Sequence, residues 1–414
     1  MQAAQGILGI LAIVGFAWVV SEDRRAFPWR TVIAGMVLQV LIAAVLLKVP
    51  QFKGFFLALN DALMSLERAT AAGTTFVFGF LGGGELPYAE TAPGRSFVLA
   101  FRALPLVLVV SALSSLLFYW RVLPTIVRAF SRVLQRVMGV GGAVGLSAAA
   151  DVFVGMIEAP LFVRPYLQVM TRGELFSVMT CGMATIAGTV MFLYASFLAG
   201  TMPDAMGHII TASLVSTPGA ILLAAVMVPA GQGVTTGELT PPQPASSSMD
   251  AITKGTIAGV ELLINIVAML VVFVALVHLA NLVLGLLPSW SGTPVTLQRT
   301  LGVVMAPVMW LIGIPWAEAS AAGALMGTKT ILNELIAYLD MAALPEGTLS
   351  TRSQTIMLYA MCGFANFGSL GILIGGLGTM VPGRREEIVQ LGLRSVLSGT
   401  LATLLTAAIV GLLI

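Results

Sequence analysis

Charged residues are scarce in this chain of 414 residues. Asp, Glu, Lys and Arg make up 10% of it, and the mean hydropathy is +0.98, whereas roughly 25% of a typical soluble domain is charged. The net charge is only +2, so no basic surface for a nucleic acid is expected. A chain that crosses a bilayer many times satisfies its backbone polar groups inside helices. The composition therefore predicts an all-α polytopic membrane protein whose surroundings are the lipid bilayer.

Cysteine and histidine are equally rare. The two cysteines, Cys181 and Cys362, both lie in apolar segments, so neither a disulfide framework nor a thiolate metal site is expected. His208 and His278 have no second ligand nearby in the sequence and are interpreted as structural. The chain also lacks a Ser/His/Asp set and a His-Glu-x-x-His motif, so we predict that it is not an enzyme and carries no prosthetic group.

Long apolar runs dominate the sequence. A transmembrane helix needs about 20 mostly apolar residues, and we predict eight spans: 5–20, 31–47, 97–120, 174–200, 207–229, 256–287, 353–380 and 388–413. Two further apolar segments, 143–170 and 314–340, are interrupted by Gly and Pro. Non-helical backbone at membrane depth is tolerated only inside protein or beside an aqueous cavity, so we expect two re-entrant hairpins there.

Positive charges indicate the orientation. Residues 122–138 place Arg128, Arg132 and Arg136 on one helical face, which predicts an interfacial amphipathic helix. With the N-terminus outside, most loop Lys and Arg residues fall on the cytoplasmic side, as the positive-inside rule requires. Basic residues follow the first apolar run and none precedes it, so we interpret that run as a retained span and not as a cleaved signal.

The chain divides into two halves that resemble each other. The first part of residues 231–254 is rich in Gly, Pro and Ser, so we predict that this segment is a flexible cytoplasmic linker. The octapeptides CGMATIAG (181–188) and CGFANFGS (362–369) share a pattern, and each follows a hairpin that carries a glutamate. Because the two copies run in opposite directions through the predicted membrane, we expect an inverted repeat, as in many secondary transporters. The predicted domains are 1–96, 97–230, the linker 231–254, and 255–414.

Acidic residues in the hairpins need an explanation. A charged side chain at membrane depth costs about 2.5–3.5 kcal/mol on insertion scales, and the hairpins contain four acids, which are Asp151, Glu158, Glu318 and Glu334. One alternative is that each acid forms a satisfied pair, for instance Glu158 with Arg164. The other is that the acids bind a transported solute and its coupling ion.

The break in the first hairpin separates two of these acids. If Gly155 ends one half-helix and Pro160 lies in the first turn of the next, Asp151 falls in the last turn of the first half-helix. Free carbonyls there, together with a carboxylate, suit a desolvated monovalent cation. Glu158 then faces a cavity and accepts hydrogen bonds from a polar solute. Glu334 lies at the tip of the second hairpin and can accept several donors in the same way.

Five segments, taken in order, resemble the concentrative nucleoside transporters. They are VGMIEAPLFVRPYL, MATIAG, IGIPWAEA, TILNELIAY and CGFANFGSLGILIGGLG. The resemblance covers nearly the whole chain. It implies a homotrimer of eight spans with two re-entrant hairpins. It also implies a scaffold domain, which includes residues 1–96 and the span after the linker, and a transport domain that moves as an elevator. We expect a bacterial inner membrane protein, and the charge bias predicts that both termini lie in the periplasm.

The resemblance also implies roles for individual residues. Those that match the family's ribose side are Glu334, Asn366 and Ser369, with Phe364 nearby. Those that match the nucleobase side are Val190 and Glu158. Those that match the sodium site are Asp151, Val154, Thr185 and Ile186, with Val154 and Ile186 acting through their carbonyls. The expected partners are a nucleoside and a coupling cation.

Two departures from the family pattern bear on specificity. The usual Gly-Gln-Thr/Ser-Glu is replaced by Gly155-Met156-Ile157-Glu158. Two lost hydrogen bonds of about 0.5–1.5 kcal/mol each predict altered base selectivity, with a purine or a modified nucleoside as substrate. Asp151 replaces the Asn of sodium-coupled members, which favours either tighter sodium binding or coupling to a proton. The alternative is a cation symporter for another heterocyclic or sugar-bearing solute.

Overall fold

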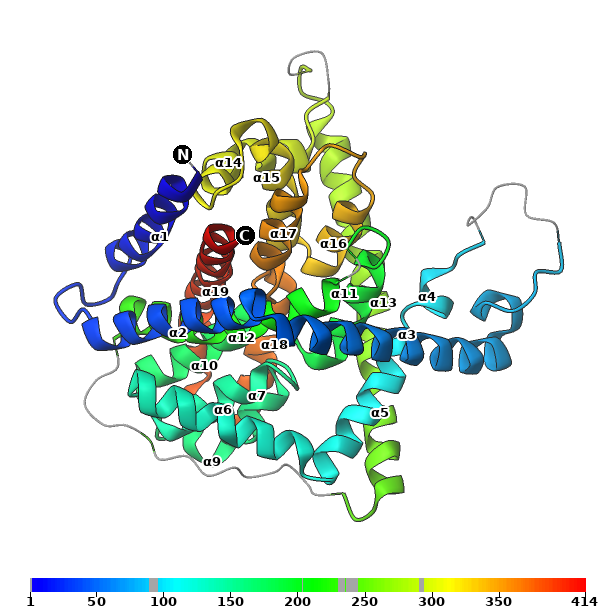
Figure 1. The fold of residues 1–414 in the computed structure, drawn as a ribbon, viewed down its shortest axis with the longest axis horizontal. Helices are drawn as coiled ribbons and strands as arrows, with labels where there is room; N and C mark the ends of the chain where they lie inside the picture. The colour runs from blue at the N-terminus through cyan, green and yellow to red at the C-terminus, as the bar shows by residue number, and fades with distance from the viewer. Residues whose placement is uncertain (1, 89–95, 203, 230–234, 236–244, 290–293) are drawn as a thin grey trace.

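The computed structural model describes residues 2–88, 96–202, 204–229, 235, 245–289 and 294–414, and the regular elements within them are all helical (Figure 1). The predicted all-α class is therefore confirmed. Residues 231–234 and 236–244 of the predicted linker lie outside the described residues. The last part of the predicted linker, from Ser248 onward, already belongs to a helix.

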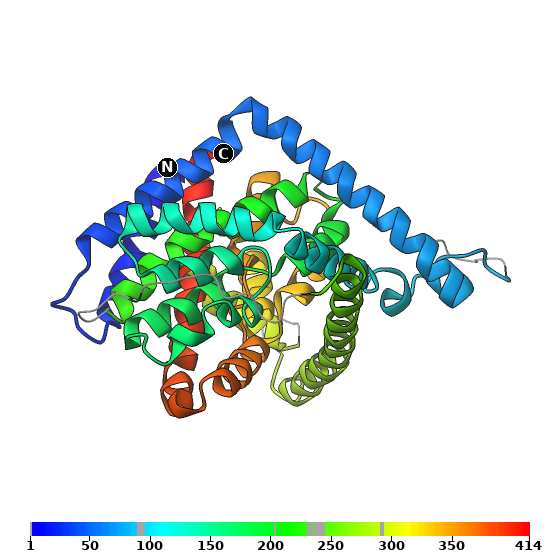
Figure 2. The same ribbon diagram turned by 90° about the horizontal axis from the view of Figure 1, so that it is seen from below.

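The N-terminal part consists of three long helices. They are α1 (Gln2–Val19), α2 (Trp29–Lys48) and α3 (Pro50–Phe78), and the short helix η1 (Gly79–Gly82) follows. α2 packs against α12 of the central bundle, whereas α3 extends away from the body of the molecule (Figure 2). Phe76, which is 91% exposed, lies near the end of α3. This arm therefore needs lipid or another protein chain to cover it.

Two series of helices follow, and their order is the same. The first series is α4 (Leu99–Arg102), α5 (Leu106–Tyr119), α6 (Val122–Met138), α7 (Gly142–Asp151), α8 (Glu158–Leu161), α9 (Arg164–Leu167), α10 (Arg172–Ala184), α11 (Gly188–Leu198) and α12 (Ala205–Met227). The second is α13 (Ser248–Leu284), α14 (Leu297–Leu311), α15 (Trp316–Ile331), α16 (Glu334–Ala342), α17 (Thr351–Met361), α18 (Phe367–Met380), η2 (Pro382–Arg384) and α19 (Arg385–Leu413). Each series contains a long helix, a second helix, a helix-break-helix segment, a broken helix and a final long helix.

Most predicted spans coincide with long helices. Within the described residues, six helical segments are long and apolar enough to cross a membrane: Trp29–Lys48, Leu99–Tyr119, Arg172–Leu198, Ala205–Met227, Ser248–Leu284 and Pro382–Leu413. The other two predicted spans correspond to the shorter α1 and to α17 followed by the apolar α18. Several apolar helices are thus established, and the predicted interfacial segment 122–138 is helix α6.

Helices α14 and α15 fold back on each other. Together they are apolar enough to span a membrane, but their axes differ by 119°, so they do not form one straight span. Glycines permit their close packing: a Cβ atom added to Gly323 would lie 2.5 Å from the carbonyl oxygen of Gly302. α14 was not predicted as a span, because it is only 15 residues long.

The core lies among α10, α12 and α19, which pack against one another. In the apolar windows of the Arg172–Leu198 and Ala205–Met227 segments, 83% of the residues are buried, whereas in α13 only 6% are. α13 packs closely against α5, since a Cβ atom on Gly255 would lie 2.6 Å from the carbonyl oxygen of Ser111. The rest of α13 faces outward, apart from the central bundle (Figure 2).

Candidate functional site

The first helix-break-helix segment separates Asp151 from Glu158. α7 ends at Asp151, and α8 begins at Glu158 with Pro160 in its first turn. Between them Gly155 has φ +116°, and a Cβ atom there would lie 2.8 Å from the Cβ of Ala187, so both the backbone conformation and the space favour glycine. The second arm consists of two one-turn helices, α8 and α9, and not of one continuous half-helix.

Asp151 is buried without a hydrogen-bond partner. Its exposed fraction is 0%, and neither carboxylate oxygen accepts a hydrogen bond from the described residues. The break between α10 and α11 lies beside it, because the Gly188 N–H donates to the Phe153 carbonyl at 3.1 Å and a Cβ on Gly182 would lie 3.8 Å from Asp151 Oδ1. A buried carboxylate without a donor requires a cation or a proton.

The other residues predicted for the cation site lie at the same two breaks. Val154 follows α7, and the buried Thr185 and Ile186 form the break after α10. In the described part of the chain, the carbonyl oxygens of Val154 and Ile186 accept no hydrogen bond. The Thr185 hydroxyl donates to the Cys181 carbonyl at 2.9 Å, which leaves its oxygen lone pairs free. Hard oxygen ligands of this kind suit Na⁺ better than a soft metal.

A second polar cluster surrounds Glu334. Asn333 caps α16 by accepting from the Ile336 N–H at 2.9 Å, which places Glu334 in the first turn. The Tyr194 hydroxyl donates to Glu334 Oε1 at 2.7 Å, and the Asn366 amide donates to Oε2 at 2.9 Å. Glu334 and Asn366 are 4% and 1% exposed. Both oxygens of a buried carboxylate are therefore held in fixed directions.

Asn366 also begins α18. Its Oδ1 accepts from the Ser369 N–H at 2.7 Å as an N-cap, so its amide group can turn only toward Glu334. The structure thus brings together Glu334, Asn366 and Ser369, the three residues that the resemblance assigns to the ribose. Phe364 lies two residues before Asn366 and is half-buried.

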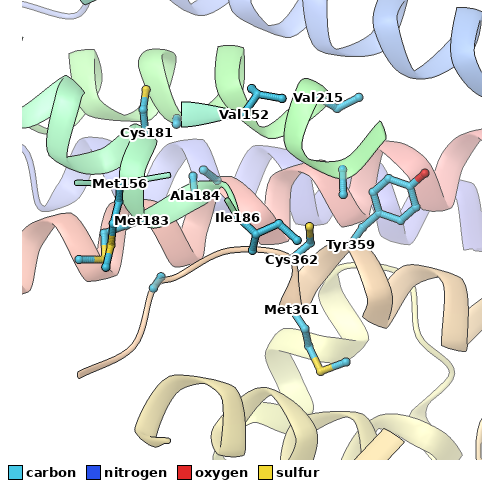
Figure 3. Packing of buried hydrophobic residues seen from close by; sticks show 14 of the residues in the cluster. Val152, Met156, Cys181, Met183, Ala184, Ile186, Val215, Tyr359, Met361 and Cys362 are labelled. Carbon is cyan, nitrogen blue, oxygen red and sulfur yellow. The ribbon is translucent and has the colours of Figure 1, made fainter. Parts of the chain in front are cut away.

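The breaks of the two broken helices contact each other. The Phe364 N–H donates to the Thr185 carbonyl at 3.2 Å. A Cβ on Gly363 would lie 2.9 Å from the carbonyl oxygen of Met183, so the two backbones approach too closely for a larger residue. Figure 3 shows Ile186 and Cys362, one from each break, in the same part of the hydrophobic core. The crossing connects the Asp151 region to the Glu334 cluster.

A cavity of about 700 Å³ adjoins the first segment. Glu158 and Val154 line it together with Thr189 of α11, and Glu158 is exposed to it. Most of the other lining residues belong to α5, the start of α6 and α13. A volume of this size is typical of a small-molecule site. Glu158 forms no ion pair with Arg164 in the described structure, so that alternative finds no support in the geometry.

Among the predicted substrate residues, Glu158 alone is part of the described lining of this cavity, and the Glu334 cluster is not. Three others are packed in the helical core. Met156 is 7% exposed, and its Cβ lies where a side chain on Gly182 would be. Ile157 packs against Gly376 of α18 in the same way. Val190 is buried in α11, four residues before Tyr194.

Sequence reasoning missed two residues beside Glu334. Tyr194 follows Val190 at helical spacing, which is a weak signal for a shared face. Lys329 lies in the last turn of α15 and is 0% exposed, and its Nζ has no hydrogen-bond partner among the described residues. Another predicted acid has a structural explanation: Glu318 accepts from the N–H and hydroxyl of Ser350, each at 3.1 Å.

Known proteins resemble this chain over its whole length. Family models described as the Na+ dependent nucleoside transporter N-terminus and C-terminus match residues 8–81 and 208–411, and one described as nucleoside recognition matches residues 100–201. The nucleoside permease NupC of Helicobacter pylori is 34% identical over 99% of this chain and 97% of its own length. The sodium/nucleoside cotransporter 1 of Rattus norvegicus is 31% identical over 98% of this chain and 63% of its own length.

Solved structures agree with these matches. The inward-facing, substrate-bound state of CNTnw is 35% identical, with a TM-score of 0.91, and the alignment covers 100% of this chain and 99% of that one. A doubly substituted CNTnw variant in an outward-facing state gives a TM-score of 0.92 at 35% identity, covering 100% and 98%. These relatives are transporters and not enzymes. The chain belongs to the concentrative nucleoside transporter family, as the sequence motifs predicted.

Proposed function

We propose that this protein is a cation-coupled symporter that carries nucleosides into a bacterial cell across the inner membrane. The observation that carries the proposal is the crossing of the two breaks, where the Phe364 N–H binds the Thr185 carbonyl. One side of the crossing bears a fixed acceptor, Glu334. The other bears Asp151, a buried carboxylate without a donor. A solute bound at Glu334 and an ion bound at Asp151 would both be held by the two broken helices that meet at this crossing.

The Glu334 cluster suits the sugar of a nucleoside. Ribose presents vicinal hydroxyl donors, and a carboxylate held by Tyr194 and Asn366 can accept both. Ser369 adds a buried hydroxyl, and Phe364 adds an aromatic face beside it. In this arrangement the base extends toward Glu158 and Val190. Because Met156 and Ile157 pack against helices, Glu158 and backbone groups read the base in place of side chains at those two positions.

The Asp151 region suits the coupling ion. The carbonyls of Val154 and Ile186, the Thr185 hydroxyl and the Asp151 carboxylate together offer four hard oxygen ligands to Na⁺. The carboxylate is also the only one of these groups that can take up a proton. Sodium is the coupling ion that the family description names, and a proton at Asp151 is the alternative.

The transport cycle that we propose is an elevator. The helix-break-helix segments 143–170 and 314–340 are re-entrant hairpins in this proposal, and the matching order of the two helix series forms an inverted repeat across eight spans. Both termini lie in the periplasm. The outward-facing surfaces of α3 and α13 supply the homotrimer contacts, and their exposure supports this assignment. The inward- and outward-facing states solved for CNTnw support a moving transport domain.

Uptake by proteoliposomes tests the assignment of the substrate site. Glu334→Gln keeps the size of the side chain but removes the charge and one acceptor, and we expect uptake of adenosine and uridine to fall at least a hundredfold, about 3 kcal/mol. Glu346→Gln changes an exposed loop acid and serves as the control. Uptake by Glu334→Gln at the level of this control would place the substrate elsewhere.

The replacement of two polar hairpin residues by Met156 and Ile157 favours one alternative. A symporter for another heterocyclic or sugar-bearing solute, such as a modified nucleoside, would use the same Glu334 cluster with a different base region. A competition panel of purine, pyrimidine and modified nucleosides separates the two. If no ribonucleoside competes for uptake of a labelled substrate, the alternative replaces the main proposal.

A further inference from the structure

Two arginines that have no side-chain partner among the described residues line the same cavity as Glu158. Arg121, the residue before α6, and Arg128 of α6 line it, as does Lys254 of α13. Lys254 pairs with Asp250 at 3.0 Å. Neither Arg121 nor Arg128 has a side-chain hydrogen bond or an ion pair in the described part of the chain. The described lining of the cavity therefore carries more positive than negative charge, since Glu158 is its one acidic residue.

The backbone at Arg121 is unusual. Its φ is +63°, and it is the only described residue other than glycine with a positive φ. Side chains with a Cβ atom disfavour this conformation, in which glycine is at ease. The bend follows α5, where the Arg121 N–H donates to the Phe118 carbonyl at 3.0 Å, and leads into α6. An arginine at a position suited to glycine points to a use for its guanidinium.

The surrounding wall adds neutral donors. Ser114 and Ser115 of α5 line the cavity on the same side, and both are only half-buried, so their hydroxyls can reach a ligand. Guanidinium groups and hydroxyls together form the donor set that recognises the oxygens of a phosphate monoester. The Glu158 carboxylate repels a phosphate, so an anion would lie beside the arginines of α6.

We infer that Arg121 and Arg128, assisted by Lys254 and the α5 serines, form a binding site for a phosphate monoester in the cavity. Resting on the proposed function, the occupant is a nucleoside 5′-monophosphate whose base points toward Glu158. In the proposed topology Arg121 and Arg128 lie on the cytoplasmic side, so the site would take a phosphate ester from inside the cell. Such a ligand would hold the cavity occupied and slow further import. The phosphate of an anionic lipid headgroup offers the same chemistry at this depth.

Calorimetric titration of the purified protein tests the site. In neutral-lipid nanodiscs, at fixed Na⁺ and low ionic strength, we expect a nucleoside 5′-monophosphate to bind at least tenfold more tightly than the nucleoside. Raising the ionic strength with choline chloride should remove most of this difference, because charge pairs near water are screened. Inorganic phosphate should compete with the monophosphate.

Substitutions locate the effect. Arg121→Gly removes the guanidinium and suits the positive φ, so it preserves the fold. Arg121→Gly and Arg128→Gln should each weaken the monophosphate by about tenfold and leave nucleoside affinity within about twofold. Arg132→Gln, one turn further along α6 and outside the cavity lining, should change neither affinity.

The same variants distinguish the two sources of phosphate. If a lipid occupies the site, phosphatidylglycerol in the nanodiscs will displace the monophosphate and raise the melting temperature of the wild type, and it will do neither in Arg121→Gly. Equal affinities for nucleoside and monophosphate, with no arginine-dependent effect of phosphatidylglycerol, would overturn the inference. A wild type that binds inorganic phosphate but no nucleoside would instead contradict the proposed function alone.

Discussion

Asp151→Asn is the substitution that most directly tests the cation site. Asparagine keeps the shape of the side chain but removes its charge and its ability to take up a proton. In the structure the carboxylate is 0% exposed and lacks a donor among the described residues, so no other described group offsets its charge. Two unit charges about 4 Å apart at an effective dielectric constant of 20 interact by about 4 kcal/mol. Desolvation offsets part of this energy.

We therefore expect a net loss of about 1–3 kcal/mol of ion binding, or about 5- to 150-fold. Uptake into proteoliposomes is measured with an imposed sodium gradient and, separately, with an imposed pH gradient. If sodium is the coupling ion, the variant needs that much more sodium for half-maximal uptake, and nucleoside affinity at saturating sodium is unchanged. If the ion is a proton, the variant loses its response to the pH gradient.

Asp340→Asn is the matched control, because Asp340 is an exposed aspartate near the end of α16, away from both breaks. It should respond to both gradients as the wild type does. The reasoning is refuted if Asp151→Asn keeps the same dependence on sodium and on pH as the wild type and this control. The ion would then bind away from the end of α7.

Two further predictions concern stability. Gly188→Ala places a Cβ 2.4 Å from the Phe153 carbonyl oxygen, so we expect it to lower the free energy of unfolding by about 1–3 kcal/mol and to lower the melting temperature. Gly200→Ala is the control, because Gly200 has open space around it, and it should have little effect. Equal melting temperatures for the two variants would contradict the packing at Gly188. Glu22 accepts two hydrogen bonds from Arg172, which hold the pKa of Glu22 below its ordinary value. The ion pair stabilises the folded protein fully above roughly pH 4.3, and this stabilisation is lost as pH falls through the lowered pKa of Glu22. Glu22→Gln should therefore reduce the loss of stability in acid by up to about 1 kcal/mol. If stability depends on pH in the same way in the variant and the wild type, the pair does not contribute.

The local breaks were predictable from the sequence. Gly155 and Pro160 restrict or free the backbone through their own covalent structure. The helix break that separates Asp151 from Glu158 could therefore be predicted without knowing any tertiary contact. The long spans followed from the length of their apolar runs in the same way. Helix α6 followed from the spacing of its charges.

Contacts between distant segments were not predictable in this way. The bond from Tyr194 to Glu334 joins residues 140 positions apart, and nothing in the local pattern of α11 specifies which hairpin it meets. The directions of Met156 and Ile157 depend on the glycines that receive them, Gly182 and Gly376. The family motifs identified the residues of the site, but the packing of small residues determines which side chains face the cavity.

The hydrogen bond between Phe364 and Thr185 has a thermodynamic consequence. In the proposed function, the Thr185 hydroxyl binds the ion, while the carbonyl of the same residue accepts the hydrogen bond from Phe364, in the segment that leads to Asn366. Ordering this peptide for one ligand lowers the conformational entropy still to be lost when the other binds. Linkage is reciprocal, so the factor by which the cation tightens the nucleoside must equal the factor by which the nucleoside tightens the cation. Through Thr185, binding of the cation would thus promote binding of the nucleoside, and binding of the nucleoside would promote binding of the cation.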